Sequence, residues 1–148
     1  MVHIDQIHEV FATDCVIDQT NFVKEYARFV ALQPKYLDWY SEAKRSLIAA
    51  NRKMKVLKLD VFKKYDEEPA KEDVPKEIRI TGQWNPKTIL KSNIPMYMDA
   101  DEDLNQLQTQ IDLLENRVNV LDSMRKTIQY MSNILNAMRE ERNYRDGG

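Results

Sequence analysis

The C-terminal third of the chain constrains the fold most, because residues 99–146 contain neither glycine nor proline. Apolar side chains recur along this stretch at spacings of three and four, which is typical of a coiled-coil stripe. After Leu121 the next apolar residue, Met124, comes one step early, so the sequence predicts either one locally overwound helix or two packed helices. The stripe comprises Leu104, Leu107, Ile111, Leu114, Val118, Leu121, Ile128, Met131, Leu135 and Met138.

The stripe can be buried inside the chain's own core or against a second copy, and the two interpretations overlap. It is only two residues wide per heptad, and a chain of 148 residues buries a smaller fraction of its surface than a large one. The mean hydropathy of −0.63 is also low for a protein with a large core. We therefore predict that these ten residues join subunits in a homo-oligomer.

The N-terminal half shows the same helical signature. Residues 20–65 contain no glycine and one proline, and apolar residues such as Phe22, Tyr26 and Phe29 follow spacings of three and four. Pro34 lacks the backbone N–H that a helix interior requires, so it is expected to kink this helix or to start a second one. The first 65 residues are therefore predicted to form an N-terminal helical region.

The segment between the two halves differs in composition. Residues 66–98 hold four of the five prolines and an acidic cluster at its start, which indicates a Pro-rich acidic linker. Within it, residues 77–81 alternate in polarity like a short strand, and Asn85-Pro86 resembles a helix start. The predicted order is thus a helical region (1–65), this linker, and a coiled-coil-like oligomerisation region (99–148). The predicted fold class is mainly α, with long helices packed as an elongated subunit and a short irregular or β-containing middle.

Several chemistries lack the residues they need. One cysteine and two histidines cannot supply the four ligands of a structural zinc site, and the single Cys15 fits a reducing compartment. Asp99, Asp101 and Asp103 resemble the start of a calcium loop, but that loop would need glycine at its sixth position, where Leu104 stands. This acidic run is instead predicted to start a helix. No glycine-rich phosphate loop, nucleophile–base arrangement, secretory signal or membrane-length apolar run is visible. We predict a non-enzymatic protein without metal, cofactor or membrane span.

The charge is distributed unevenly along the chain. Its net charge is −2, yet residues 44–64 contain eight Lys and Arg side chains and one acid, Asp60, which makes +7 locally and −9 elsewhere. Like charges three and four residues apart on a helix repel one another, so such a stretch favours a polyanionic partner over a merely solvated face. We predict a nucleic-acid contact, with an aromatic ring available for base stacking, at Arg45, Arg52, Lys53, Lys55, Lys58, Lys63, Lys64 and Tyr65.

The order of these features resembles the UvsY family of recombination mediators from T-even-type tailed phages and their marine relatives. The resemblance runs from about residue 14 to 140 and is most specific over residues 90–104, which contain Pro-Met-Tyr-Met-Asp. The family's short basic motif, Lys-Ala-Arg-Leu, is not reproduced, and its nearest equivalent is Lys55–Leu59 followed by Lys63 and Lys64. Residues 78–84 have no counterpart in the family pattern.

The resemblance implies a small helical protein that assembles into a hexameric or heptameric ring in the cytoplasm of the infected bacterial host. It implies single-stranded DNA binding through the basic region, help in removing the single-strand-binding protein, and loading of a strand-exchange recombinase. The residue pattern leaves a second function class open, a structural or adaptor coiled-coil protein of a phage assembly with no DNA role. The basic stretch would then contact an acidic partner.

Overall fold

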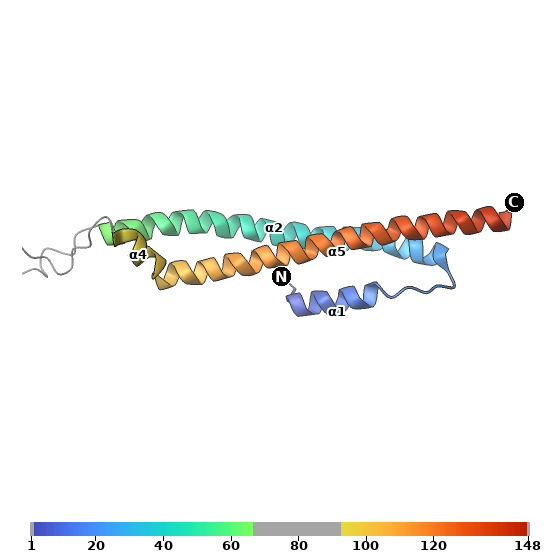
Figure 1. Cartoon of the computed structure of the whole chain (residues 1–148), viewed down its shortest axis with the longest axis horizontal. Helices are drawn as coiled ribbons and strands as arrows, with labels where there is room; N and C mark the ends of the chain where they lie inside the picture. Colours follow the sequence, from blue (N-terminus) through green and yellow to red (C-terminus); the bar gives the residue numbers. More distant parts are fainter. Residues whose placement is uncertain (1, 67–92, 148) are drawn as a thin grey trace, which may run out of the picture. The chain divides into compact units, whose positions relative to one another are not determined.

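The computed structural model describes residues 2–66 and 93–147, and within these ranges the chain is built from α-helices (Figure 1). The long helices confirm the predicted mainly α fold class. The predicted strand at 77–81 and the predicted helix start at Asn85 lie outside the described residues. The helices are α1 (Ile4–Asp14), α2 (Phe22–Asp66), α4 (Ile94–Asp99) and α5 (Glu102–Gly147).

The chain divides into two compact units, of which the first is formed by two separate segments of the sequence. Unit 1 comprises Met1–Ile48 and Leu113–Gly148, and unit 2 comprises Ala49–Asp112. Each long helix contributes one part to each unit. The three segments predicted from the sequence (1–65, 66–98 and 99–148) were defined by their composition. The two units are instead defined by which parts of the chain pack together.

Unit 1 has a core of heptad-spaced residues from two helices. On α2, Phe29, Tyr36 and Ala43 are seven residues apart and buried, and on α5 Leu121, Ile128 and Leu135 follow the same interval. Ile7 of α1 completes the cluster with no exposed surface. A seven-residue interval returns each side chain to nearly the same side of its helix, so the two rows can pack against each other along their length.

The helix α2 continues through Pro34, so no second helix starts there, which was one of the two outcomes expected at this proline. The proline side chain is exposed, so its ring lies on the solvent side of the helix, where the lost backbone hydrogen bond is least harmful. One residue earlier, Gln33 Nε2 donates a 3.0 Å hydrogen bond to Oγ of the buried Ser132 on α5. Packing on both sides of Pro34 therefore maintains a single helix of 45 residues.

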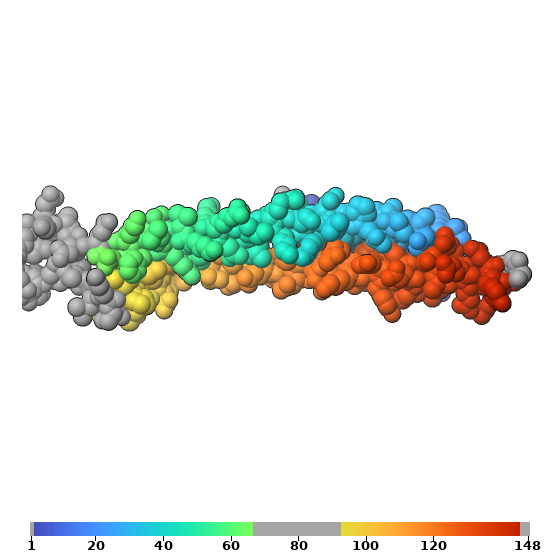
Figure 2. All heavy atoms as spheres, turned by 90° about the horizontal axis from the view of Figure 1, so that it is seen from above, coloured from blue at the N-terminus to red at the C-terminus, as the bar shows by residue number. Residues whose placement is uncertain are grey.

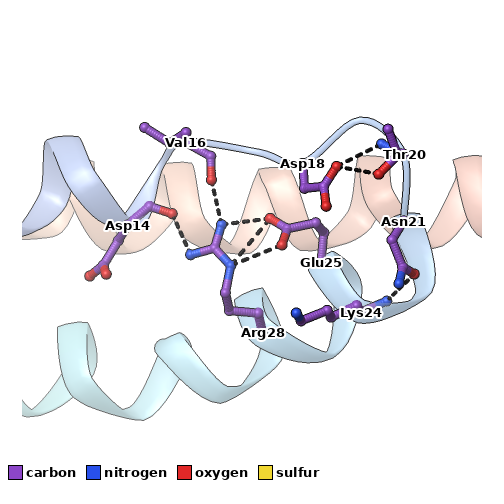
Figure 3. A network of polar contacts seen from close by, with 8 residues as sticks. All are labelled: Asp14, Val16, Asp18, Thr20, Asn21, Lys24, Glu25 and Arg28. Atoms are coloured by element: carbon purple, nitrogen blue, oxygen red, sulfur yellow. Dashed lines mark hydrogen bonds and ion pairs between the residues drawn. The ribbon is translucent and has the colours of Figure 1, made fainter.

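The first helix, which the sequence analysis did not single out, is joined to α2 by Arg28 (Figure 3). Its guanidinium donates to the carbonyl oxygens of Asp14 at 2.8 Å and Val16 at 2.6 Å, just where α1 ends. It also pairs with the carboxylate of Glu25, one turn earlier on α2, at 2.6 Å. One cation thus satisfies carbonyls at the C-terminal end of α1 and holds them against α2.

The turn that leads into α2 is stabilised by short polar side chains. Asp18 Oδ1 accepts hydrogen bonds from the backbone N–H and the hydroxyl of Thr20. Asn21 Oδ1 accepts from the backbone N–H of Lys24 at 3.1 Å, which is the N-cap arrangement (Figure 3). These bonds set the residue at which α2 begins.

Unit 2 packs the end of α2 against α4 and the start of α5. Met54 and Val61 of α2, Ile94 of α4 and Leu104 of α5 are all buried. In the space-filling view the green end of α2 adjoins the yellow side chains of α4 (Figure 2). Of the acidic run predicted to start the C-terminal helix, Asp103 lies in the first turn of α5 and Asp101 comes directly before that helix, whereas Asp99 ends α4.

The apolar stripe of α5 is part of one continuous helix, and most of it packs within the chain. No helix break occurs at Met124, where the early spacing allowed one, and Leu121 and Met124 are both buried. Contacts inside a single chain cover the larger part of the stripe, and its role in joining subunits stays a prediction. The buried members are Leu104, Leu107, Ile111, Leu121, Ile128 and Leu135.

Candidate nucleic-acid interface

The basic residues of α2 lie on its solvent side in unit 2. Arg52 and Lys63 are eleven residues apart, which is about three helical turns, so they fall on the same side. The buried Met54 and Val61 each lie two residues from one of them, roughly opposite. All the predicted lysines and arginines are exposed, and Arg45 belongs to unit 1 while the others belong to unit 2. We call the unit 2 set the basic face: Arg52, Lys53, Lys55, Lys58, Lys63 and Lys64.

Part of the basic face lacks acidic partners among the described residues, whereas the charge of Lys64 acts on the nearby Asp101. Within residues 2–66 and 93–147, no ion pair joins Arg52, Lys55 or Lys58 to a carboxylate, whereas Lys126 pairs with Asp122 at 2.8 Å. Arg52, Lys55 and Lys58 follow one another at intervals of three residues. Each such pair of like charges destabilises a helix by a few tenths of a kcal/mol. A bound polyanion would relieve this repulsion.

Tyr65, predicted as a base-stacking ring, is held by contacts within unit 2. Its hydroxyl donates to Asp101 Oδ2 at 3.0 Å, and this bond to a carboxylate raises the pKa of Tyr65. Its ring lies 5.7 Å from the ring of Tyr97, and Nζ of Lys64 lies 5.4 Å from its centroid. The ring is therefore already engaged with two neighbours, and base stacking at Tyr65 stays a prediction.

The carboxylate that binds Tyr65 also begins the next helix. Asp101 Oδ1 accepts from the backbone N–H of Leu104 at 3.1 Å, and this bond is the main reason the pKa of Asp101 is lowered. Tyr65 and the nearby charge of Lys64 lower it further. The acid is thus committed to the structure of unit 2, so it does not cancel the positive charge of the more N-terminal lysines of the basic face.

Beside the basic face lies a groove that the sequence analysis did not identify. Its volume is about 400 Å³, and it is lined by residues of α2, α4 and α5, among them Lys58 and Phe62. Phe62 is 42% exposed and follows Lys58 by four residues, so the two lie on neighbouring turns of one side of α2. The four-residue spacing of Lys58 and Phe62 is the one feature of the sequence that could have indicated this groove.

Two arginines of unit 1, Arg125 and Arg139, pack against aromatic rings and do not extend the basic face. Arg125 lies 4.9 Å from the ring centroid of Tyr40 and pairs with Asp122 at 2.6 Å. Arg139 lies 4.6 Å from the ring centroid of Tyr26. These cations stack on aromatic rings between α2 and α5, which accounts for them as structural residues.

The described residues contain no group of three side chains suited to hold a metal ion. Cys15 is partly buried, and desolvation is the main cause that raises the pKa of its thiol, which keeps the less reactive thiol form. In the described part of the chain, no helix has both the length and the apolar character needed to cross a membrane.

Long paired helices, with exposed basic residues that lack acidic partners in the described part of the chain, define a helical protein suited to bind a polyanion. The profile of one protein family, described as "Recombination, repair and ssDNA binding protein UvsY", matches residues 10–148. The chain therefore belongs to the UvsY family, as the resemblance in its sequence indicated. A comparison with curated protein sequences gives no significant match.

Solved structures support the same fold. The chain is similar to the recombination mediator protein UvsY of bacteriophage T4 in three crystal lattices. The type II structure has a TM-score of 0.73 at 18% identity and covers 100% of both chains. The type IV structure has a TM-score of 0.72 at 15% identity and covers 97% of this chain and 99% of that one. The type I structure has a TM-score of 0.68 at 17% identity, with 95% and 98% covered. At these identities the likeness establishes a shared fold.

Proposed function

We propose that this protein binds single-stranded DNA on the basic face of α2 and acts as a recombination mediator. In this role it helps to displace single-strand-binding protein and loads a strand-exchange recombinase, in the cytoplasm of the infected bacterial host. The observation that carries the proposal is the row of exposed basic side chains without acidic partners in the described chain, on a helix of a UvsY-family fold.

The basic face is suited to the DNA backbone more than to base edges. Lysines such as Lys55 and Lys63 present ammonium groups on flexible stems, which follow a phosphate chain without a fixed geometry. Each phosphate they neutralise releases bound counterions, and this release favours binding without sequence preference. A mediator needs such binding because it acts on single strands of any sequence.

The proposed assembly is a ring of six or seven copies, and exposed apolar residues of unit 1 are candidates for the contact between copies. Along α2, Val23, Val30 and Leu37 are seven residues apart and all exposed, at 55%, 42% and 47%. This second heptad row is not used by the core of unit 1. On α5 the members of the predicted stripe that are not buried and lie outside that core are Leu114 and Met138, whereas Val118 and Met131 pack against it.

An assembly of this kind would strengthen weak DNA contacts. When several basic faces engage one strand, each further contact forms at a high effective concentration, and the overall affinity exceeds that of one subunit. A strand held in this way is withdrawn from the single-strand-binding protein, and the assembly then presents it to the recombinase.

The proposal is tested with a double variant, Lys55→Gln and Lys58→Gln, and a matched control, Lys126→Gln. All three lysines are exposed on long helices, but Lys126 is paired with Asp122. At low salt the double variant is expected to bind a single-stranded oligonucleotide about tenfold more weakly than the unaltered protein, whereas the control is expected to bind normally. Unaltered protein that binds no oligonucleotide at low salt would contradict the proposal and leave the adaptor function.

The mediator step has its own readout. Recombinase-driven strand exchange on DNA coated with single-strand-binding protein is expected to speed up when the unaltered protein is added. The double variant should stimulate it less in proportion to its lost affinity. Strong DNA binding without any stimulation would show a DNA-binding protein that is not a mediator.

A further inference from the structure

The groove beside the basic face combines an apolar interior with a polar rim. It has a volume of about 400 Å³ and lies wholly within unit 2. The buried side chains of Met54, Ile94 and Leu104 form its floor, and the exposed ring of Phe62 forms part of one wall. The helix α4 supplies the facing wall and adjoins the end of α2 (Figures 1 and 2). We call it the α2–α4 groove.

Four polar side chains also line the groove, and we call them its rim. Lys58 belongs to the basic face, and Asp99 lies at the end of α4. Asn105 and Gln108 come from the first turns of α5. The Gln108 amide nitrogen donates to Asp112 at 2.9 Å, which leaves its carbonyl oxygen to accept, and the Asn105 amide has no hydrogen-bond partner within the described residues.

We propose that the α2–α4 groove takes one unpaired nucleobase of the single strand whose phosphates lie on α2. This inference rests on the proposed function and adds a base-binding subsite to it. A nucleobase has two apolar faces and a polar edge, which match a groove with an apolar floor, an aromatic wall and a rim of amides. Lys58 stands where the phosphate of the same nucleotide would lie, so the charge of the rim is complementary to the ligand.

The rim also argues against a purely apolar occupant. A leucine or valine from a second copy would fill the floor, but it would cover the amide of Asn105 and the charges of Lys58 and Asp99 without offering them partners. Burying such groups unpaired is unfavourable. A nucleobase instead donates and accepts along its edge: amides can serve either role, and a carboxylate can accept from an exocyclic amino group.

The subsite would give the protein a preference for single strands. A base inside a duplex is stacked and paired, so it cannot enter the groove unless it is first extruded. The amide rim offers both donors and acceptors, so it would tolerate each of the four bases. The basic face alone would not distinguish single from double strands in this way.

The test compares strands that share phosphates but differ in bases. A homopolymeric oligothymidine and an abasic strand of equal length are titrated at the same salt against unaltered protein, Phe62→Ala and Phe62→Leu. A matched control is Val56→Ala, which removes an exposed apolar side chain, 61% accessible, from the same helix. The salt dependence of binding and the mass of the assembly are measured for each.

The unaltered protein is expected to bind oligothymidine about tenfold more tightly than the abasic strand, which corresponds to one stacked base per subunit. Both Phe62 variants should lose most of this difference while their salt dependence and mass stay unchanged, and Val56→Ala should retain it. A 2-aminopurine in the strand should lose fluorescence on binding the unaltered protein and recover it with Phe62→Ala.

Equal binding of oligothymidine and abasic strands would overturn the base-binding subsite while leaving phosphate binding, and the proposed function, intact. The same conclusion would follow if Phe62→Ala kept the full preference for bases. A fall in assembly mass in Phe62→Ala would assign the groove to a second copy instead. Failure to bind either strand would be a failure of the proposed function itself.

Discussion

The hydroxyl of Tyr65 donates a 3.0 Å hydrogen bond to the carboxylate of Asp101, a residue 36 positions further along the chain. The other oxygen of that carboxylate accepts from the backbone N–H of Leu104 and caps α5. One acid therefore joins the C-terminal end of the basic helix to the beginning of the next long helix. The basic face and the α2–α4 groove are held in one unit by this junction.

Replacing Asp101 separates its two roles. Asp101→Ala removes both the cap and the acceptor for Tyr65. Asp101→Asn keeps an oxygen that can cap α5 but replaces the second oxygen with an amide nitrogen, which can only donate to the tyrosine hydroxyl. We expect the urea midpoint, followed by circular dichroism, to fall furthest for Asp101→Ala, less for Tyr65→Phe, and least for Asp101→Asn. Equal midpoints for the alanine and asparagine variants would show that the cap contributes nothing.

Arg28 is expected to be required as an arginine, not merely as a cation. A lysine at this position keeps the charge but cannot reach the carbonyls of Asp14 and Val16 and the carboxylate of Glu25 together. Arg28→Lys should lower the free energy of unfolding by about 2 kcal/mol in urea titrations. The control is Arg145→Lys, whose partner Glu141 is exposed, and it should change stability by less than about 0.5 kcal/mol. If Arg28→Lys lowered the free energy of unfolding as little as Arg145→Lys does, the bridging role of Arg28 would be contradicted.

The Arg28–Glu25 pair predicts how stability changes in acid. The hydrogen bond from Arg28 is the main cause that lowers the pKa of Glu25 below its ordinary value of 4.5. The Glu25 carboxyl binds a proton less tightly in the folded state than in the unfolded state. The stability that this pair contributes is therefore complete above pH 4.5 and is lost as the pH falls through the lower pKa that Glu25 has in the folded state. The free energy of unfolding should therefore decline below pH 4.5, and Glu25→Gln should flatten that decline. An unchanged profile in Glu25→Gln would assign the acid sensitivity to other carboxylates.

Core and assembly positions should respond differently to substitution. Ile128→Ala removes a fully buried side chain and should cost about 3 kcal/mol of stability. The paired change Val30→Ser and Leu37→Ser alters exposed residues, so it should lower the mass found by light scattering with little loss of monomer stability. If the serine variant kept the full mass, this heptad row would not be a subunit contact.

Apolar spacing was enough to predict helices in both halves of the chain, although it left open whether each half forms one helix or two. Heptad rows such as Phe29 with Tyr36 and Ile128 with Leu135 determine which sides are buried. The same spacing did not reveal the partner of the α5 stripe. A row that packs against α2 and a row that packs against a second subunit have the same period, so a single sequence does not distinguish them. The continuity of α2 at Pro34 also depends on tertiary packing, which outweighs the local cost of proline.

The basic residues of the candidate site could be predicted from the sequence, but the roles of its aromatic residues could not. The basic residues were found from charge alone, and the structure places them on the solvent side of α2. The roles of aromatic residues depend on contacts between distant segments. Tyr65 is engaged by Asp101 and Tyr97, whereas the ring of Phe62 borders the α2–α4 groove. No local pattern encodes that difference.

The central claim, that the basic face holds the phosphates of single-stranded DNA, is tested most directly by the salt dependence of binding. The logarithm of the affinity is plotted against the logarithm of the salt concentration for the unaltered protein and for the Lys55→Gln, Lys58→Gln double variant. Each phosphate contact on a single strand contributes a slope of about −0.7, so the double variant should have a slope shallower by about 1.4 per subunit engaged. An identical slope for the two proteins would contradict the claim.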